Sequence, residues 1–296
     1  MRDKLRRLLR DADPADLTDD ASIEDFLDQS AHAKFYGGNT SCVEVQCDDE
    51  TFIFDAGSGM RGLAETMLAD GRSKDHPIHI LFTHFHWDHL CGLPFFVPVY
   101  LPGRELDIRS WRDDTERLLK IQMSDAFFPV KWDGLPSKIM CSQLMPEQAN
   151  QVGGGVVTLK KLQHPDGCYG YRLTRGGRSV CYLTDTEVSQ NPELLSAGYA
   201  EFVEGADLVL VDAMYGFLDY HEHYNYGHSS IFTWIDFFRD SKIGELVVFH
   251  HDPAADDIAL GKLADAAQRY RELVAPEAAW SLSVAYEGQT WDLAES

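Results

Sequence analysis

The chain lacks the long apolar runs, paired cysteines and excess positive charge that mark several large classes of protein. No stretch approaches the ~20 apolar residues of a membrane span, and the basic first residues are not followed by the apolar core of an export signal. The six cysteines include no Cys-x-x-Cys pair, and 296 residues far exceed the length of a disulfide-framed mini-domain. We therefore expect a cytoplasmic protein with no membrane partner.

Positive charge is scarce in this sequence. Lysine and arginine together number 26 against 48 aspartates and glutamates, which gives a formal net charge of -22. Such a charge repels a phosphate backbone at long range, so a long nucleic acid is disfavoured as a partner, although bound divalent metal ions would reverse the sign locally. Glycine-rich turns at 37–40 and 57–59 fit neither the dinucleotide nor the Walker spacing, so they predict turn geometry only.

The most informative stretch of the chain is rich in metal ligands. Residues 78–82 form an apolar run typical of a buried strand, and it is followed by His84, His86, Asp88 and His89. Side chains two positions apart share a face of an extended chain, so His84 and His86 can converge on one ion while the two later ligands reach a second. This spacing predicts a two-metal site at the C-terminal edge of a strand, and it indicates a hydrolase.

The loop resembles the His-x-His-x-Asp-His signature of the metallo-β-lactamase superfamily. The resemblance implies an α/β fold, a four-layer αβ/βα sandwich, with three further ligands downstream. His164 matches the later ligand of the first ion, and Asp185, at the end of an apolar strand, matches the carboxylate that bridges both ions. After the apolar run 246–249 the sequence offers two adjacent histidines for the last position, and we prefer His250 to His251.

Composition sets the first part of the chain apart. Residues 1–32 join a basic amphipathic turn to acidic, proline-interrupted sequence, and they predict an N-terminal helical extension packed on the domain in preference to a membrane-surface helix. Residues 33–296 form, by the resemblance, one metallo-β-lactamase-like hydrolase domain. Within it Asp55, after a strand pattern, is implied to orient a ligand imidazole from behind the metal loop.

Periodicity predicts the elements around the remaining candidate residues. A hairpin is expected from residues 169–174 and 179–183, and helices are expected at 230–240 and towards residue 274. A helix-like stretch also covers residues 111–123. Strands followed by helices favour layered α/β packing.

A further pair of residues narrows the choice within the superfamily. Asp212 follows an apolar strand pattern, and His228 opens a His-Ser-Ser motif. The pair resembles the branch of ribonuclease Z and the PhnP-type cyclic phosphodiesterases, in which an acidic residue after a strand pairs with a histidine of a His-Ser-Thr-like motif. The chain departs from ribonuclease Z in having aspartate at 212, where that enzyme has glutamate.

Together these residues predict a metal-dependent phosphodiesterase that acts on a small, cyclic phosphodiester through a hydroxide bound by two metal ions. The expected catalytic residues are Asp88, His228 and Asp212, with the histidine assisting the leaving group. The expected metal ligands are His84, His86 and His164 on one ion, Asp88, His89 and His250 on the other, and Asp185 between them. The imidazole-rich set favours zinc, while manganese and iron also suit it.

Several alternatives stay open at this point. A thioester or lactone hydrolase of the same superfamily would use the same two ions, because they activate water against carbonyl carbon as well as phosphorus. A ribonuclease Z-like RNA-processing nuclease is a second alternative. Such an enzyme should carry a basic insertion that binds RNA, and the segment between Asp185 and Leu208 is too short and too acidic to provide one. In a third, the ions only stabilise the fold. The expected partner is a small-molecule phosphodiester, and a homodimer stays open.

Overall fold

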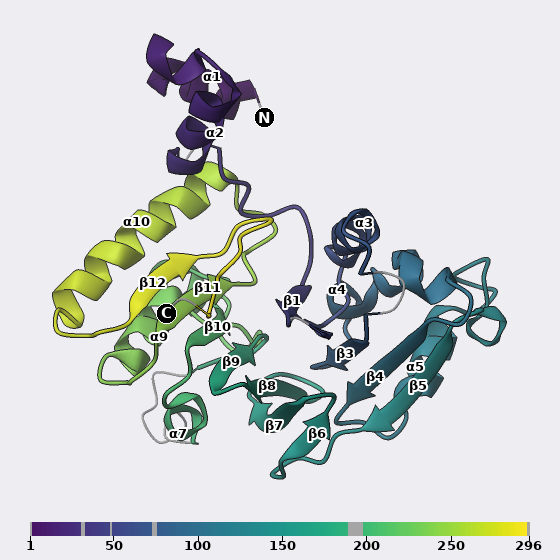
Figure 1. The fold of residues 1–296 in the computed structure, drawn as a ribbon. Coiled ribbons are helices and arrows are strands. Elements are labelled where there is room, and N and C mark those ends of the chain that lie inside the picture. Colours follow the sequence, from purple (N-terminus) through teal and green to yellow (C-terminus); the bar gives the residue numbers. More distant parts are fainter. Residues whose placement is uncertain (1, 31–32, 48, 73–75, 189–197, 295–296) are drawn as a thin grey trace.

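The computed structural model describes residues 2–30, 33–47, 49–72, 76–188 and 198–294 (Figure 1). These residues form two β-sheets with helices on their outer sides. The α-helices are α1 (Arg2–Asp11), α2 (Asp20–Gln29), α3 (Met60–Ala69), α4 (Trp87–Leu90), α5 (Thr115–Gln122), α7 (Tyr199–Val203), α8 (Phe217–Glu222), α9 (Ile231–Phe238) and α10 (Asp257–Val274). Short 3-10 helices are η1 (Pro14–Leu17), η2 (Leu93–Phe95), η3 (Val97–Tyr100) and η4 (Trp132–Gly134).

The first sheet has the strand order β1-β2-β3-β4-β5. Its strands are β1 (Val43–Gln46), β2 (Thr51–Phe54), β3 (Ile78–Phe82), β4 (Glu105–Ser110) and β5 (Lys138–Gln143). Only the β1 and β2 pair is antiparallel, so the carboxyl ends of β2, β3, β4 and β5 share one edge. The metal-ligand loop after β3 begins at this edge.

The second sheet has the order β12-β11-β10-β9-β8-β7-β6. Its strands are β6 (Asn150–Val152), β7 (Gly155–Leu162), β8 (Cys168–Arg175), β9 (Arg178–Leu183), β10 (Leu208–Asp212), β11 (Glu245–Phe249) and β12 (Ser281–Val284). Strands β9 to β12 are parallel, and β6 to β9 alternate in direction. The carboxyl ends of β7, β9, β10 and β11 therefore share one edge.

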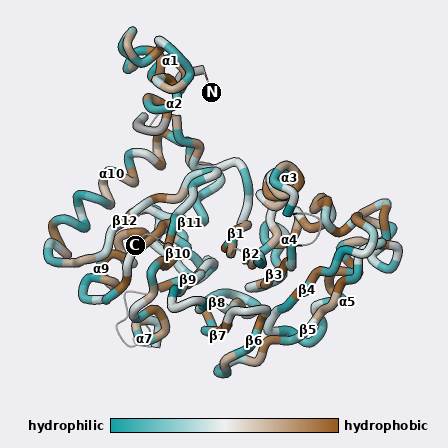
Figure 2. Tube along the Cα trace, in the orientation of Figure 1, coloured by the Kyte–Doolittle hydropathy of each residue, from teal (hydrophilic) through white to brown (hydrophobic). Residues whose placement is uncertain are grey.

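Three apolar clusters separate four layers. One lies between the sheets and includes Phe54 and Leu81 from the first sheet and Tyr182 from the second. A second packs α3 and α5 on the outer face of the first sheet, and a third packs α9 and α10 on the outer face of the second. The order helix, sheet, sheet, helix confirms the expected αβ/βα sandwich, and Figure 2 shows hydrophobic residues recurring along the strands.

The helices at the start of the chain stand out from the rest of the fold. α1 and α2 project from the sandwich beside the start of α10 (Figure 1). Nζ of Lys4 lies 2.8 Å from Oδ2 of Asp257 and anchors α1 to α10. Among the described residues, no helix is both long and apolar enough to span a membrane.

Candidate metal centre

Four of the predicted ligands lie on the segment that follows β3. His84 and His86 lie in the loop between β3 and α4, and Asp88 and His89 lie in α4 itself. The ring centroid of His84 is 4.4 Å from that of His86 and 4.2 Å from that of His89. His89 is fully buried, whereas the Asp88 side chain is 40% exposed. The cluster is therefore accessible to solvent at Asp88 and at His86.

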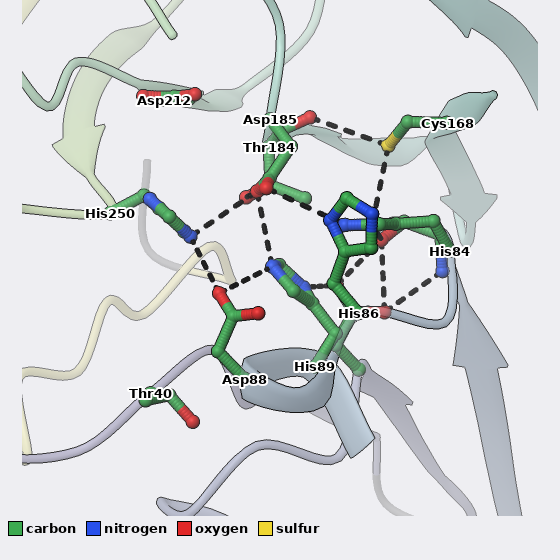
Figure 3. A network of polar contacts seen from close by, with 12 residues as sticks. Thr40, His84, His86, Asp88, His89, Cys168, Thr184, Asp185, Asp212 and His250 are labelled. Carbon is green, nitrogen blue, oxygen red and sulfur yellow. Dashed lines mark hydrogen bonds and ion pairs between the residues drawn. The ribbon is translucent and has the colours of Figure 1, made fainter. Parts of the chain in front are cut away.

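The other three predicted ligands come from the second sheet. His164 follows β7, Asp185 follows β9 and His250 follows β11, so all three lie at the shared carboxyl edge of that sheet. Figure 3 shows Asp185 and His250 facing Asp88 and His89 across the site. The fold thus brings together residues that are far apart in the sequence.

Asp185 lies between two histidine pairs. Its Oδ2 atom is 3.5 Å from Nε2 of His84 and 3.6 Å from Nε2 of His164. Its Oδ1 atom is 3.1 Å from Nε2 of His89 and 3.3 Å from Nε2 of His250. Each carboxylate oxygen therefore faces one pair of imidazoles.

The described residues form three groups that could hold a metal ion, each with donor atoms within 4.8 Å of one another; the smallest consists of Asp212, His228 and His250, and the other two contain the predicted ligands. Of these two, the first contains His84, His86, His164 and Asp185, and the second contains Asp88, His89, Asp185 and His250. His251 lies outside both groups, because its Nε2 pairs with the carbonyl oxygen of Ala285 at 2.8 Å. The geometry favours His250 over His251 as the last ligand.

The donor set fits divalent metal ions. Among the described residues, Nε2 of His84 and Nε2 of His89 are buried and make no hydrogen bond, although each faces an oxygen of Asp185 at 3.5 and 3.1 Å. A buried polar atom without a partner costs free energy, and a metal ion would satisfy both nitrogens. Imidazole and carboxylate donors suit zinc, manganese and iron, so the residues present are compatible with two such ions.

The electrostatics of the two groups differ. Burial lowers the pKa of His84 to about 2, which keeps this ring neutral. Burial opposes a proton on His250 as well, but the carboxylates of Asp185, Asp88 and Asp212 together outweigh it and raise the pKa of His250 to about 9. In the same way Asp185 and Asp55 raise the pKa of the buried His89 well above its usual value. Carboxylates that stabilise protons on these rings would equally stabilise a divalent cation.

Asp55 lies behind the metal loop, where the resemblance led us to expect it. Its Oδ2 atom is 2.8 Å from Nδ1 of the His89 ring and also accepts a hydrogen bond from the hydroxyl of Tyr182 at 3.2 Å. Its Oδ1 atom accepts from the backbone N–H of Thr83 at 2.8 Å. Because Asp55 occupies Nδ1, the ring presents Nε2 to Asp185, as a ligating imidazole requires.

Sequence reasoning missed three other partners of the ligand histidines. Nδ1 of His164 lies 3.0 Å from the carbonyl oxygen of Gly227. Nδ1 of His84 lies 3.1 Å from the hydroxyl of Thr83 and 3.6 Å from the sulfur of Cys168. A contact with a backbone carbonyl cannot be predicted from residue types. The hydroxyl of Thr83 could have been predicted as a partner, because Thr83 lies directly before the ligand loop.

Backbone strain marks the same strand ends. Asp55, Asp185 and His250 have φ angles of 58°, 49° and 57°, in the left-handed region that side chains other than those of glycine rarely adopt. Each lies within two residues of the end of a strand. Such conformations cost about 1–3 kcal/mol each and cluster at functional sites.

The predicted pair of Asp212 and His228 lies beside both groups. Nδ1 of His228 donates to Oδ2 of the buried Asp212 at 2.6 Å, and the backbone N–H of Thr186 holds the same oxygen at 3.2 Å. The His228 ring stacks on His250, with centroids 5.2 Å apart, and meets His164 edge-on at 5.5 Å. Burial lowers the pKa of His228, but the hydrogen bond with Asp212 and the negative charge of that carboxylate together outweigh it and raise the pKa above its usual value.

Comparison with known proteins gives a consistent result. The family model described as "Beta-lactamase superfamily domain" matches residues 50–251, more than half of the chain. Ribonuclease Z of Bradyrhizobium sp. (strain ORS 278) is 23% identical over 274 residues, covering 76% of this chain and 88% of the relative. The metallo-beta-lactamase fold protein YhfI from Bacillus subtilis superimposes with a TM-score of 0.64 at 20% identity, covering 87% of this chain and 94% of YhfI. A diphosphatase from the PhnP family gives a TM-score of 0.59 at 20% identity, with 85% and 83% covered.

These similarities confirm the superfamily, the fold and the branch that the ligand loop and the His-Ser-Ser motif indicated. They give no support to the expectation that a long nucleic acid is disfavoured, because one relative is named a ribonuclease. The chain belongs to the beta-lactamase superfamily; it is similar in sequence to ribonuclease Z and shares its fold with a diphosphatase of the PhnP family.

Proposed function

We propose that this protein is a metal-dependent phosphodiesterase that hydrolyses a small, cyclic phosphodiester. The observation that carries the proposal is the pair of His228 and Asp212, which lies against His250 and His164 of the two ligand groups. Hydrolysis of a phosphodiester expels an alkoxide or phenolate, which needs a proton donor more than the expulsion of a thiolate does. A histidine held by a buried carboxylate supplies such a donor.

The proposed ligands are the seven residues of the two groups, and zinc is the proposed metal. Two divalent ions, when bound, activate water and neutralise negative charge on the phosphate. The first group offers three imidazoles and the second two, each completed by Asp185, and the second also includes the partly exposed Asp88. The protein residues direct inward Nδ1 of His86 and Nε2 of the other four rings, and they would leave the Asp88 side open to a substrate.

His228 is proposed to transfer a proton to the leaving oxygen. Its Nδ1 is bound to Asp212, which leaves Nε2 for the substrate, and the side chain is 14% exposed. Asp212 cannot turn away, because the backbone N–H groups of Thr186 and Met214 donate to its two oxygens at 3.2 and 3.1 Å. Its carboxylate therefore fixes the ring and favours a proton on it.

The test is hydrolysis of bis(p-nitrophenyl) phosphate, beside a thioester and a lactone. The protein is stripped of metal and reloaded with zinc or manganese, and His228→Ala is compared with His221→Ala, an exposed histidine of the neighbouring α8. We expect metal-dependent hydrolysis of diesters, with a loss in His228→Ala of about 100-fold or more for methyl phenyl phosphate, whose leaving group is poor, a smaller loss for bis(p-nitrophenyl) phosphate, and no change in the control. Hydrolysis of the carbonyl substrates alone, indifferent to His228, would replace the proposal with a thioester or lactone hydrolase.

A ribonuclease Z-like activity is the second candidate, and the similarity to Ribonuclease Z over 88% of that protein favours it. Against it stand the net charge of -22 and the absence of any lysine or arginine from the sequence 186–207. A structured RNA with a 3′ extension, offered to the zinc-loaded protein, separates the two. Site-specific cleavage of this RNA at low enzyme concentration would favour the nuclease over the small-molecule enzyme.

A further inference from the structure

Glu187 is a buried carboxylate that the proposed chemistry does not use. It lies two residues after Asp185 and is 8% exposed. Its Oε1 atom accepts hydrogen bonds from the hydroxyl of Tyr220 at 3.1 Å and the backbone N–H of Asn225 at 3.0 Å. Its Oε2 atom accepts from the backbone N–H of Gly227 at 3.0 Å. All three donors belong to one segment, residues 217–228, which runs from α8 to His228.

Apart from the buried side chain of Tyr220 and the His223 ring, which stacks on Tyr215, this segment has few anchors. Its other large side chains, at Phe217, Leu218, Tyr224 and Tyr226, are 50–76% exposed, so they stabilise its conformation little. Two of its residues adopt left-handed backbone, Asn225 with φ 68° and Gly227 with φ 87°. A surface turn of this kind needs specific hydrogen bonds to remain in one conformation, and Glu187 accepts three of them.

The end of the segment touches the metal centre at two points. The carbonyl oxygen of Gly227 faces Nδ1 of the ligand His164 at 3.0 Å, and the next residue is His228. A side chain at Gly227 would overlap the His164 ring, so backbone and imidazole are in close contact there. A shift of the Gly227 amide therefore moves both the ligand and the proposed proton donor.

The backbone on either side of Glu187 reinforces this contact. The Glu187 N–H donates to the carbonyl oxygen of Gln163, directly before His164, at 2.9 Å. The N–H of Val188 donates to the hydroxyl of Ser229, directly after His228, at 2.9 Å. Residues 186–188 are thus fastened to both histidine-bearing segments, with the Glu187 carboxylate at the centre.

We propose that Glu187 is a positioning residue, which holds His228 in place by fixing the amide of the adjacent Gly227. The inference rests on the proposed function, because His228 matters to catalysis only if a leaving group takes its proton. Glutamine at 187 can keep an oxygen towards Tyr220 and Asn225, but it sets an NH₂ group against the Gly227 N–H. Glu187→Gln therefore removes the contact that the proposal depends on and leaves the others, whereas Glu187→Ala removes all three.

The first experiment measures hydrolysis of methyl aryl phosphates whose leaving groups range from p-nitrophenol to phenol. A misplaced proton donor matters most for the poorest leaving group, so we expect kcat of Glu187→Gln to fall about tenfold for phenol and less than about threefold for p-nitrophenol, with KM little changed. In a His228→Ala background the same substitution should have no further effect on this dependence. Glu222→Ala, an exposed glutamate at the end of α8, is the matched control and should behave as the parent. Equal losses for all leaving groups, or losses that add to those of His228→Ala, would overturn the proposal.

The second experiment does not depend on activity. Amide hydrogen exchange of peptides covering residues 223–229 in the zinc-loaded protein should be at least about tenfold faster in Glu187→Ala than in the parent, and unchanged in Glu222→Ala. Unchanged exchange in Glu187→Ala would refute the anchoring itself. If the parent hydrolyses no phosphodiester but the exchange behaves as expected, the phosphodiesterase proposal fails and the anchoring by Glu187 stands.

Discussion

Replacing Asp55 by asparagine tests how the fold prepares a histidine for a metal ion. The buried carboxylate has Oδ2 at 2.8 Å from Nδ1 of His89 and Oδ1 at 2.8 Å from the N–H of Thr83. Asparagine has the same shape and can keep its oxygen on Thr83. Its NH₂ group would then face the Nδ1–H of His89, and two donors cannot pair. The NH₂ group of the asparagine finds an acceptor only if the proton of His89 moves from Nδ1 to Nε2. That move removes the Nε2 lone pair that faces Asp185.

The expected magnitude follows from this change of tautomer. Loss of an outer carboxylate on a ligating histidine weakens metal binding about 10- to 100-fold. At about 1.4 kcal/mol for each factor of ten, the affinity of the second group should fall by about 1.4–2.7 kcal/mol. The first group contains no atom that touches Asp55, so one of the two ions should be affected and the other retained.

The measurement is competition for zinc with a chromophoric chelator, which counts sites and gives the affinity of each. Asp107→Asn is the matched control, because Asp107 is also buried and lies 3.0 Å from Nδ1 of a buried histidine, His79, in the same sheet. Both variants should lower the free energy of unfolding of the metal-free protein. Only Asp55→Asn should weaken zinc binding, and an Asp55→Asn protein that binds two zinc ions with parental affinity would refute the reasoning.

Further predictions concern the last ligand, the contact of Gly57 with the ligand loop, and the N-terminal helices. His250→Ala should weaken one zinc site at least about 100-fold, whereas His251→Ala should leave zinc affinity unchanged, as the same titration will reveal. Gly57→Ala should lower the melting temperature and the zinc affinity together, because the added methyl group would overlap the carbonyl oxygen of Asp88, a ligand residue. Burial opposes the charge of Asp257, but the hydrogen bond and the charge of Lys4, together with the hydrogen bond from the backbone N–H of Tyr36, lower its pKa below 3.8. The anchoring of α1 should therefore be complete above pH 3.8 and should weaken as the pH falls through the lowered pKa. The measurement is amide hydrogen exchange in α1, which should become faster over this pH range. Exchange in α1 that does not change with pH would contradict the pairing of Lys4 with Asp257.

The positions of the metal-ligand candidates could be predicted because each follows an apolar strand, and strand patterns are the clearest signal in this sequence. The expected hairpin corresponds to β8 and β9, and the helix expected at 230–240 is α9, which begins after the cap residue Ser230. The sequence alone does not decide which of the two histidines after β11 lies in the site, because His250 and His251 are adjacent. Their directions depend on the left-handed backbone at His250.

Strand β4 was not predicted, for a physical reason. Its sequence places Asp107 and Arg109 within the strand, and such residues suggest a solvated loop. In the fold Oδ2 of Asp107 lies 3.0 Å from Nδ1 of His79 and 2.8 Å from Nε of Arg109, so the charges are buried as a paired network. Pairing between distant segments decides the burial of these groups, and a single sequence does not contain that information.

The helix-like stretch 111–123 was predicted too long. Helix α5 begins only at Thr115, because the preceding residues continue from β4 towards the site. Nε1 of Trp111 donates to the carbonyl oxygen of Thr83 at 2.9 Å and so supports the start of the ligand loop. A tertiary contact of this kind overrides local helix propensity.

The division of the ligands between the two sheets makes any bound ion a cross-link between the halves of the chain. Each group takes some of its donors from the segment after β3 and the others from the ends of β7, β9 and β11, so neither half can complete a site alone. An ion present at 100 times its dissociation constant stabilises the joined halves by about 2.7 kcal/mol. The amount of folded protein in a cell would then follow the supply of the metal, and starvation for that metal would lower the abundance of the protein as well as its activity.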